Sequence, residues 1–453
     1  MLLLKILAMY LPQYHEIKEN NEWWGKGYTE WTAVKKAKPI YKGHRQPRVP
    51  LKNNYYDLSD ENATTWKWQA KLAKKYGIYG FCIYHYWFKT GVQLLEKPME
   101  ILLNHPEIDI RYCICWANES WARNWYGLHE QILQLQEYGG ENEWVNHFQY
   151  LLQFFKDTRY IKIDNKPVVN IYRTRNIVEL EGMIRCWNRL AKENGFDGIY
   201  VVSANTSDKI DKRSELFDAY YNFEPECTFH HYMKKTNQAR YFFRKKIVLF
   251  SNTICRKKKL WGKFPAKWIY EKNIGNNTIN NKKVYFGTFV GWDNTPRRSY
   301  KGRVIISSPE EFKNNLKRIL IQYRNDNRTD DFIYINAWNE WGEGAYLEPD
   351  EWHEYAWLEA VQQAFAEASH DGGGERESFA VTPRRSSSAI CASFSPYRAS
   401  RGRSMLSSPL GTSGARGHIW SRTNGTAMHG SRPCGRPWRR RTPTKSPLRG
   451  QML

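Results

Sequence analysis

Apolar runs in the first 370 residues predict eight β-strands. Several of these runs, such as VVNIY and IYVVS, are apolar on both faces, which is typical of parallel strands that are covered on both sides. Polar or helical sequence follows each run, as expected where strands end. The predicted strands are 3–10, 77–87, 110–116, 167–172, 198–203, 216–222, 284–290 and 332–337.

Helical periodicity lies between most of these strands. The clearest helical patterns are 59–77, 142–157, 177–195, 308–326 and 351–368. Strands that alternate with helices predict an α/β fold, and eight such strands predict a (β/α)8 TIM barrel. We expect the barrel to occupy residues 1–370, with a long first βα loop over 11–58 and a basic insertion over about 225–283, before the seventh strand.

The last 83 residues differ from the rest in composition, because Arg, Ser, Gly and Pro supply 46 of them. Apolar periodicity ends after Ala368. We therefore expect 371–453 to form a disordered tail. Two other interpretations stay open. The tail is either a basic arm for nucleic acid or an anionic membrane, or the product of a frameshift or junction.

The net charge of +23 is unevenly distributed along the chain. The tail carries 15 basic and 3 acidic residues, and the segment 234–267 carries 12 basic residues and no acid. The rest of the first 370 residues is nearly balanced, so we expect no specific nucleic-acid partner. The segment 234–267 is either a solvated insertion or a contact for an anionic partner, such as a lipid-linked phosphate or a membrane surface.

The start of the chain and its cysteines favour a cytoplasmic location. MLLLKILAMYLPQYH lacks a basic n-region, so it predicts a buried strand rather than a signal peptide. No run reaches the roughly 18 apolar residues of a membrane-spanning helix. The eight Cys lack CxxC spacing, which fits a reducing compartment, and Cys113 and Cys115 are expected in the core. Peripheral attachment to the inner membrane stays open.

The residues that follow the predicted strands are rich in aromatic, amide and carboxyl side chains. In a barrel, the active site lies at the carboxyl ends of the strands. Aromatic faces stack on pyranose rings, and amides and carboxylates bind their hydroxyls, so these side chains predict a sugar site. The candidate substrate-binding residues are Tyr14, His85, Tyr86, Trp116, Asn118, Glu119, Trp292, Asp293, Trp338, Asn339 and Trp341.

Glu340 and Glu343 are the candidate catalytic residues. Cleavage of a glycosidic bond needs two carboxyl groups across an oxocarbenium-like centre. Gly342 lies between them and permits a turn, but the sequence leaves retaining and inverting geometries open. The chain has no Gly-rich nucleotide-binding turn and no metal-ligand spacing that stands out, so we expect neither a cofactor nor a metal.

Six longer motifs resemble those of one protein family. They are MYLPQYH, EWWGKGYTEW, FCIYHYWF, CWANESWARNW, FVGWDNTPRR and AWNEWGEGAYLEPD. Together they resemble the WbsX family of bacterial surface-polysaccharide proteins, which are commonly labelled glycosyltransferases. That family is similar to the endo-α-mannosidase-like barrels of glycoside hydrolase family 99. The resemblance covers roughly residues 4–366 and leaves the tail without a counterpart.

This resemblance implies a carbohydrate-active barrel enzyme in the biosynthesis of lipopolysaccharide O-antigen or capsule, acting on an oligosaccharide or a lipid-linked glycan. The hydrolase motif Trp-Asn-Glu-Trp-x-Glu-Gly matches residues 338–344. By that match, Glu340 deprotonates the 2-hydroxyl that attacks the anomeric carbon. Glu343 protonates the leaving oxygen and then activates water or an acceptor hydroxyl. Hydrolysis and glycosyl transfer both stay open, and so does a catalytically silent glycan-binding barrel.

Overall fold

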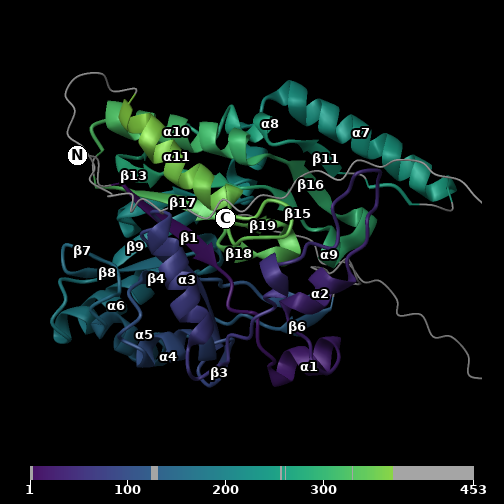
Figure 1. Ribbon diagram of the computed structural model, residues 1–453. Coiled ribbons are helices and arrows are strands. Elements are labelled where there is room, and N and C mark those ends of the chain that lie inside the picture. Colours follow the sequence, from purple (N-terminus) through teal and green to yellow (C-terminus); the bar gives the residue numbers. More distant parts are fainter. Residues whose placement is uncertain (1–3, 124–130, 256–257, 261, 329, 371–453) are drawn as a thin grey trace, which may run out of the picture. The chain divides into compact units, whose positions relative to one another are not determined.

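The computed structural model describes residues 4–123, 131–255, 258–260, 262–328 and 330–370 (Figure 1). All of them belong to one unit, Met1–Arg376. The predicted disordered tail, 371–453, and residue 3 of the first predicted strand lie outside the described residues.

Most of the predicted strands form one row of a parallel sheet. Neighbouring strands are hydrogen-bonded in the order β10–β9–β8–β4–β2–β1–β17, and every pair in this row is parallel. Their carboxyl ends therefore lie at the same edge of the sheet. The strands are β1 (Lys5–Tyr10), β2 (Gly80–Lys89), β4 (Arg111–Trp116), β8 (Lys166–Ile171), β9 (Tyr200–Asn205), β10 (Ala219–Asn222) and β17 (Phe332–Asn336).

The predicted strand 284–290 is divided into two strands. β13 (Lys282–Tyr285) pairs with β10 and β14 (Gly287–Phe289) pairs with β17, both in parallel. Phe286 joins them, and its carbonyl oxygen accepts a hydrogen bond from the Tyr334 N–H at 3.1 Å. β10 and β17, the two end strands of the row, therefore pair with neighbouring parts of one segment, 282–289.

Side chains from distant strands meet on the inner face of the sheet. The Tyr334 hydroxyl donates to Asn170 Oδ1 at 2.8 Å, and the Tyr334 ring stacks on Tyr221 with 4.3 Å between ring centres. Cys113 and Cys115 contact the same group and are fully buried. Their predicted place in the core is confirmed.

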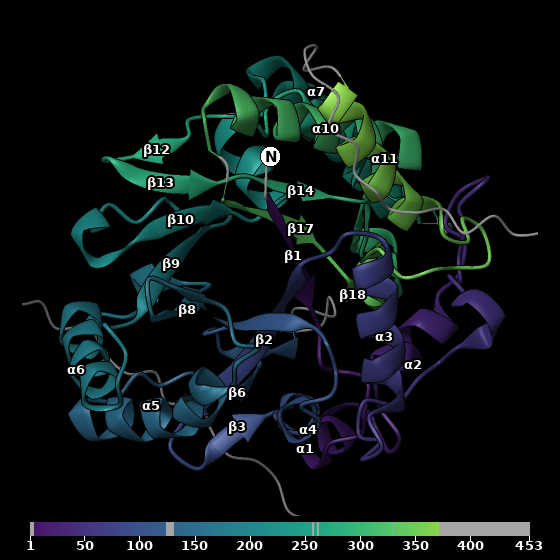
Figure 2. The same ribbon diagram turned by 60° about the vertical axis from the view of Figure 1, so that its left-hand side comes forward.

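Long helices cover the outer side of the sheet (Figure 2). Each predicted helix is present with shifted ends, and α4 (Lys97–Asn104) is an additional helix that the periodicity does not predict. Between β9 and β10 the chain forms only a 3₁₀ turn, Ser214–Leu216, so the alternation is interrupted there. The long helices are α3 (Thr64–Lys75), α5 (Glu141–Lys156), α6 (Leu180–Glu193), α10 (Pro309–Asn325) and α11 (Ala356–His370).

The described residues of the basic insertion form helices and a strand that share a second apolar core with neighbouring segments. It contains α7 (Lys235–Ile254), β11 (Gly262–Pro265) and α8 (Lys267–Tyr270). β11 pairs with β16 (Arg303–Ile306), which pairs with β15 (Trp292–Asp293). Aromatic residues of the insertion share this buried cluster with Phe289 of β14 and Trp292 of β15. The insertion therefore supports the chain that follows the seventh strand.

The first loop and the segments after the seventh and eighth strands are also ordered. They carry α1 (Lys18–Trp24), α2 (Glu30–Lys36), α9 (Thr295–Arg298), β18 (Asn339–Glu340) and β19 (Ala345–Tyr346). The remaining short strands are β3 (Val92–Leu94), β5 (Trp121–Ala122), β6 (Ile132–Gln134), β7 (Lys162–Ile163) and β12 (Thr278–Ile279).

Within the described ranges, no helix is long and apolar enough to cross a membrane.

Candidate active site

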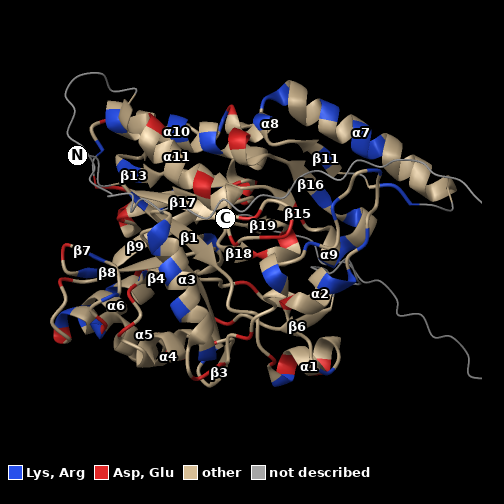
Figure 3. Cartoon of the chain, viewed as in Figure 1, with Lys and Arg blue, Asp and Glu red and all other residues tan. Residues whose placement is uncertain are grey.

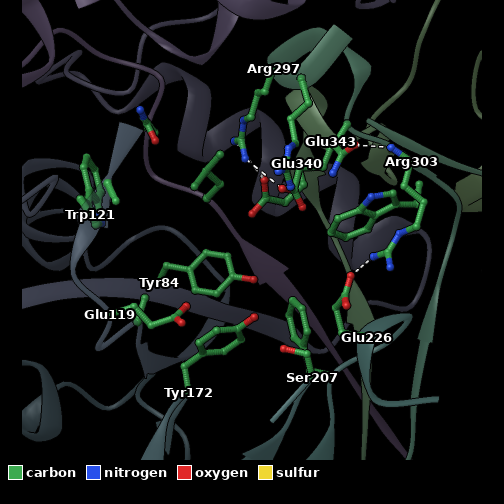
Figure 4. A pocket seen from close by; sticks show the side chains of 18 of the residues that line it. Tyr84, Glu119, Trp121, Tyr172, Ser207, Glu226, Arg297, Arg303, Glu340 and Glu343 are labelled. Atoms are coloured by element: carbon green, nitrogen blue, oxygen red, sulfur yellow. Dashed lines mark hydrogen bonds and ion pairs between the residues drawn. The ribbon is translucent and has the colours of Figure 1, made fainter. Parts of the chain in front are cut away.

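A cavity of about 550 Å³ opens at the carboxyl ends of the strands (Figure 4). This volume falls within the range of about 300–1,000 Å³ that small-molecule sites occupy. Each of the eight predicted strands contributes a lining residue near or just past its carboxyl end, where the sequence places the site. These residues are Leu11, Tyr86, Ala117, Tyr172, Ser207, Phe223, Trp292 and Glu340.

The two candidate catalytic residues share one cation. Glu340 and Glu343 both line the cavity, and both contact the guanidinium of Arg297, which belongs to α9. Arg297 Nη1 lies 3.0 Å from Glu343 Oε1, and Nη2 lies 3.6 Å from Glu340 Oε2. The guanidinium thus holds both carboxyl groups at one wall of the cavity.

A tight hairpin sets the position of the pair. Glu340 ends β18, which pairs with β19 across the 3₁₀ turn Trp341–Glu343. Gly344 follows with a φ of +60°, a conformation that favours glycine. A Cβ atom there would also lie 2.8 Å from the Cβ of Asp293. The hairpin therefore packs directly on the segment after the seventh strand.

A third carboxyl group, Glu30, belongs to the same cluster. Arg297 Nε and Nη2 lie 3.0 and 2.8 Å from Glu30 Oε1, and the Glu30 side chain is fully buried. Glu30 begins α2 in the long first loop. Arg297 therefore connects the first loop to the hairpin that carries the candidate catalytic pair.

Burial and neighbouring charges favour the protonated forms of the pair. Burial first, and then the charge of Glu343, raise the pKa of Glu340 well above its ordinary value, while Arg297 opposes the shift. Burial and the charge of Glu30 likewise raise the pKa of Glu343, opposed by Arg297. Two buried carboxyl groups beside one guanidinium repel each other when both are ionised, so protonation of Glu340 or Glu343 is favoured.

A second arginine borders the same wall. Arg303 forms an ion pair with Glu226, and its guanidinium lies 5.5 Å from the centre of the Trp292 ring. Burial lowers the pKa of Arg303 to about 10, and the charge of Glu343 opposes this shift. Arg303 is therefore still cationic at neutral pH and adds positive potential beside the carboxyl groups.

The wall across the cavity is aromatic. Figure 4 shows Tyr84 and Tyr172 facing Glu340 and Glu343 with their hydroxyls in the cavity. Burial raises the pKa of both tyrosines, so both hydroxyls are protonated and can donate hydrogen bonds. Glu119 lies beside them and accepts a hydrogen bond from Arg173 at 2.9 Å. Aromatic surface with hydroxyl and carboxyl groups suits a sugar ring.

The sequence matches the family model described as "Glycosyltransferase WbsX" over residues 6–361. The chain belongs to the WbsX glycosyltransferase family. This membership supports a carbohydrate-active enzyme.

Curated relatives of this WbsX-family chain include the uncharacterized protein WxcX from two strains of Xanthomonas campestris pv. campestris. Each is 33% identical to this chain over 368 residues, which cover 80% of this chain and 50% of the relative. The chain thus spans about half the length of the curated relatives it matches.

Two solved structures align with most of this chain. A GH99 endo-alpha-mannosidase from Bacteroides thetaiotaomicron aligns with a TM-score of 0.48 and 12% identity, covering 81% of this chain and 97% of that protein. A protein described as "Glycoside hydrolase-like protein" aligns with a TM-score of 0.48 and 11% identity, covering 80% and 94%.

The predicted site residues of this WbsX-family chain divide into two groups. The residues that line the cavity are Tyr86, Glu119, Trp292, Glu340 and Glu343. The residues that are buried but do not line the cavity are Tyr14, His85, Trp116, Asn118, Asp293, Trp338, Asn339 and Trp341. The second group lies behind the walls, where it supports the residues that line them.

One set of these residues anchors the hairpin to the first strand. The side chain of Asn339 accepts from the N–H of Leu11 at 2.8 Å and donates to its carbonyl at 3.0 Å. The Tyr14 hydroxyl donates to the carbonyl of Asn339. Trp341 Nε1 donates to Glu348 at 2.7 Å. These contacts fix the backbone on which Glu340 lies.

Side-chain alternation explains why His85 lies outside the cavity. Successive residues of a strand point to opposite faces, and Tyr84 and Tyr86 of β2 line the cavity. The His85 ring is buried on the other side, with its Nε2 at 2.9 Å from Nε2 of His147, and burial lowers the pKa of His85 to about 3. Trp116 packs against the same His147.

Asn118, Asp293 and Trp338 also have supporting positions. Asn118 Oδ1 accepts a hydrogen bond from the N–H of Arg173 at 2.8 Å. Asp293 Oδ2 lies 2.8 Å from Nε2 of His44 and so connects the first loop to β15. Trp338 is fully buried in the main core.

Sequence reasoning did not select Arg297 or Glu30, although both lie in motifs of the WbsX family. Arg297 is in FVGWDNTPRR and Glu30 is in EWWGKGYTEW. A usable signal was present, because a buried pair of carboxyl groups needs a cation nearby, and two consecutive arginines follow the seventh predicted strand.

Proposed function

We propose that this chain cleaves or transfers a glycosidic bond, with Glu340 and Glu343 as its base and acid. The observation that carries the proposal is the contact of both carboxyl groups with Arg297 at one wall of a cavity, opposite Tyr84 and Tyr172. Both glutamates have raised pKa values, so they can exchange protons at a pH closer to neutral than an ordinary carboxyl group can.

The match to the hydrolase motif supports the division of roles. Glu340 takes the proton of the 2-hydroxyl while that oxygen attacks the anomeric carbon. The bond to the leaving oxygen breaks, and Glu343 gives that oxygen its proton. Water or an acceptor hydroxyl then gives its proton to Glu343 and attacks the anomeric carbon. This attack opens the 1,2-anhydro ring, and Glu340 returns its proton to the 2-oxygen. The reaction uses only carboxyl groups.

We infer that the parallel sheet closes as a (β/α)8 barrel. Support comes from Phe286, which joins the strand paired with β10 to the strand paired with β17. The contacts of Tyr334 with Asn170 and Tyr221 across the inner face give further support. Closure gathers the carboxyl ends of all eight strands around one mouth, which accounts for the lining of the cavity.

The proposed setting is assembly of a bacterial cell-surface polysaccharide, either lipopolysaccharide O-antigen or capsule. Membership of the WbsX family supports this setting. The proposed substrate is an oligosaccharide or a lipid-linked glycan, and the proposed location is the cytoplasm, with peripheral attachment to the inner membrane. Hydrolysis and transfer use the same two carboxyl groups and differ in what attacks the anomeric carbon.

The test is a product assay on the purified full chain. Panels of α- and β-linked oligosaccharides are incubated with and without a lipid-linked acceptor, and products are identified by mass spectrometry. Glu340→Gln and Glu343→Gln run beside the wild type, and Glu181→Gln, at an exposed helix position, serves as the matched control.

Each outcome of this assay has a clear meaning. New reducing ends that disappear in both site variants indicate hydrolysis, and products that need the acceptor indicate transfer. Glycan binding without turnover, equal in wild type and both variants, would contradict the proposal and favour a silent glycan-binding barrel.

A further inference from the structure

Helix α7 presents a row of large apolar side chains to solvent. Phe243, Ile247, Phe250 and Ile254 are between 53 and 71% exposed. Their spacing of four, three and four residues places them along one face of the helix. Four apolar side chains at this spacing form a continuous stripe, which differs from the scattered apolar residues of an ordinary surface.

The opposite face of α7 is the one that packs on the protein. Asn237, Tyr241 and Asn252 are its buried residues. The Tyr241 ring lies 5.2 Å from that of Phe229 and 5.4 Å from that of Phe264, measured between ring centres. The helix is thus fixed by its inner face, and the apolar stripe is left on the outside.

Basic side chains lie on both sides of the amino-terminal part of the stripe. Lys235, Arg240, Arg244 and Lys246 are exposed on the same helix, and no acidic residue occurs in 234–267. Figure 3 shows this distribution along α7. An exposed apolar face between basic residues is the pattern of a helix that lies in the interface of an anionic membrane.

We propose that α7 lies in the surface of an anionic phospholipid membrane, with Phe243, Ile247, Phe250 and Ile254 among the acyl chains. The charge argues against a second copy of the chain as the occupant, because two acid-free basic helices repel each other. The helix does not meet the criteria for a membrane-spanning segment, because it carries too many basic residues for its length.

The inner face of the same helix borders the cavity, because Tyr241 and Lys245 line it. A membrane-bound α7 therefore brings the cavity close to the lipid headgroups, where a lipid-linked glycan would be within reach. This last consequence rests on the proposed function. The membrane contact itself does not, so the two can fail separately.

The test is flotation of the purified full chain with vesicles. One set contains phosphatidylcholine alone, and the other contains phosphatidylcholine mixed with phosphatidylglycerol. We expect the wild type to float with the second set. The double variant Phe243→Ser/Phe250→Ser should bind about a hundredfold more weakly, since burial of each of the two phenyl rings contributes at least the roughly 1.4 kcal/mol of a tenfold change. The matched control, Val178→Ser, removes an exposed apolar side chain elsewhere and should bind normally.

Two further measurements separate the outcomes. The basic tail is present in every variant, so its salt-sensitive attraction is a common background. Glu340→Gln should bind vesicles like the wild type even when turnover is lost. Equal vesicle binding by the double variant and the wild type would overturn the proposal. A wild-type dimer in sedimentation velocity that the double variant dissociates would also overturn it, because a second copy would then cover the stripe.

Discussion

A Cβ atom on Gly342 would overlap Oε1 of Glu30. The turn between the two candidate catalytic residues therefore depends on a glycine because a buried carboxyl group occupies the space beside it. The same carboxyl group contacts Arg297. The absence of a side chain at Gly342 thus lets three segments meet closely: the hairpin itself, the first loop with Glu30, and α9 with Arg297.

Gly342→Ala should lower kcat by about tenfold to a hundredfold, because it displaces Glu30 and Arg297 from the pair, and small misplacements are costly in catalysis. Steady-state kinetics measure this effect. The matched control is Gly275→Ala, because a Cβ atom there would meet no atom within 4 Å. A Gly342→Ala variant with wild-type kcat would contradict the close packing described above.

Arg297→Met should reduce kcat by about a hundredfold or more, which is the usual effect of removing a positioned electrostatic partner. Arg297→Lys should recover only part of the loss, because an ammonium group lacks the planar fork that reaches several carboxyl groups. Kinetics of both variants and of the exposed control Arg185→Met check this. Equal activity of Arg297→Met and the control would contradict the role of Arg297.

The pH dependence of kcat/KM should be bell-shaped. The active form has Glu340 ionised and Glu343 protonated, so activity falls at low pH, where both groups are protonated, and at high pH, where both are ionised. Because burial raises both pKa values, both limbs should lie above the pH at which an ordinary glutamate titrates. In Arg297→Met both limbs should move to higher pH, since Arg297 lowers both values. Limbs that stay in place would contradict this electrostatic account.

Residues of the site could be predicted from sequence where the local pattern decides their position. The strands are apolar on both faces, and Glu340 and Glu343 follow the last strand closely, so the sequence predicts their place at the mouth of the sheet, where both line the cavity. Alternation could have separated Tyr86 from His85, because neighbours on a strand face opposite sides. Arg297 and Glu30 lie 267 positions apart in the sequence and meet only in the fold. The division of the seventh strand at Phe286 likewise depends on two different partners, which the sequence does not show.

Protein stability should decrease as pH rises because of Glu224. Burial raises the pKa of Glu224 to about 8, although Thr228 donates to it. The folded state therefore keeps a proton that the unfolded chain loses near its ordinary value. The free energy of unfolding should fall by up to about 1.4 kcal/mol per pH unit between these two values.

Glu224→Gln cannot ionise, so it should remove this part of the pH dependence and be more stable than the wild type above pH 8. Denaturant unfolding at a series of pH values measures the difference. If the free energies of unfolding of variant and wild type differ by the same amount at every pH, then folding does not raise the pKa of Glu224, and the prediction is wrong.

The division of labour between Glu340 and Glu343 is tested most directly with two leaving groups. The substrate found in the glycan panel is compared with the glycosyl fluoride of the same sugar, whose departure needs no protonation. We predict that Glu343→Gln loses turnover of the oligosaccharide but still releases fluoride in a first turnover, since only the later attack by water needs Glu343 as a base. Glu340→Gln should lose both reactions, because the 2-hydroxyl then has no base. Wild-type turnover of the oligosaccharide by Glu343→Gln would contradict the assignment of this pair as the catalytic groups.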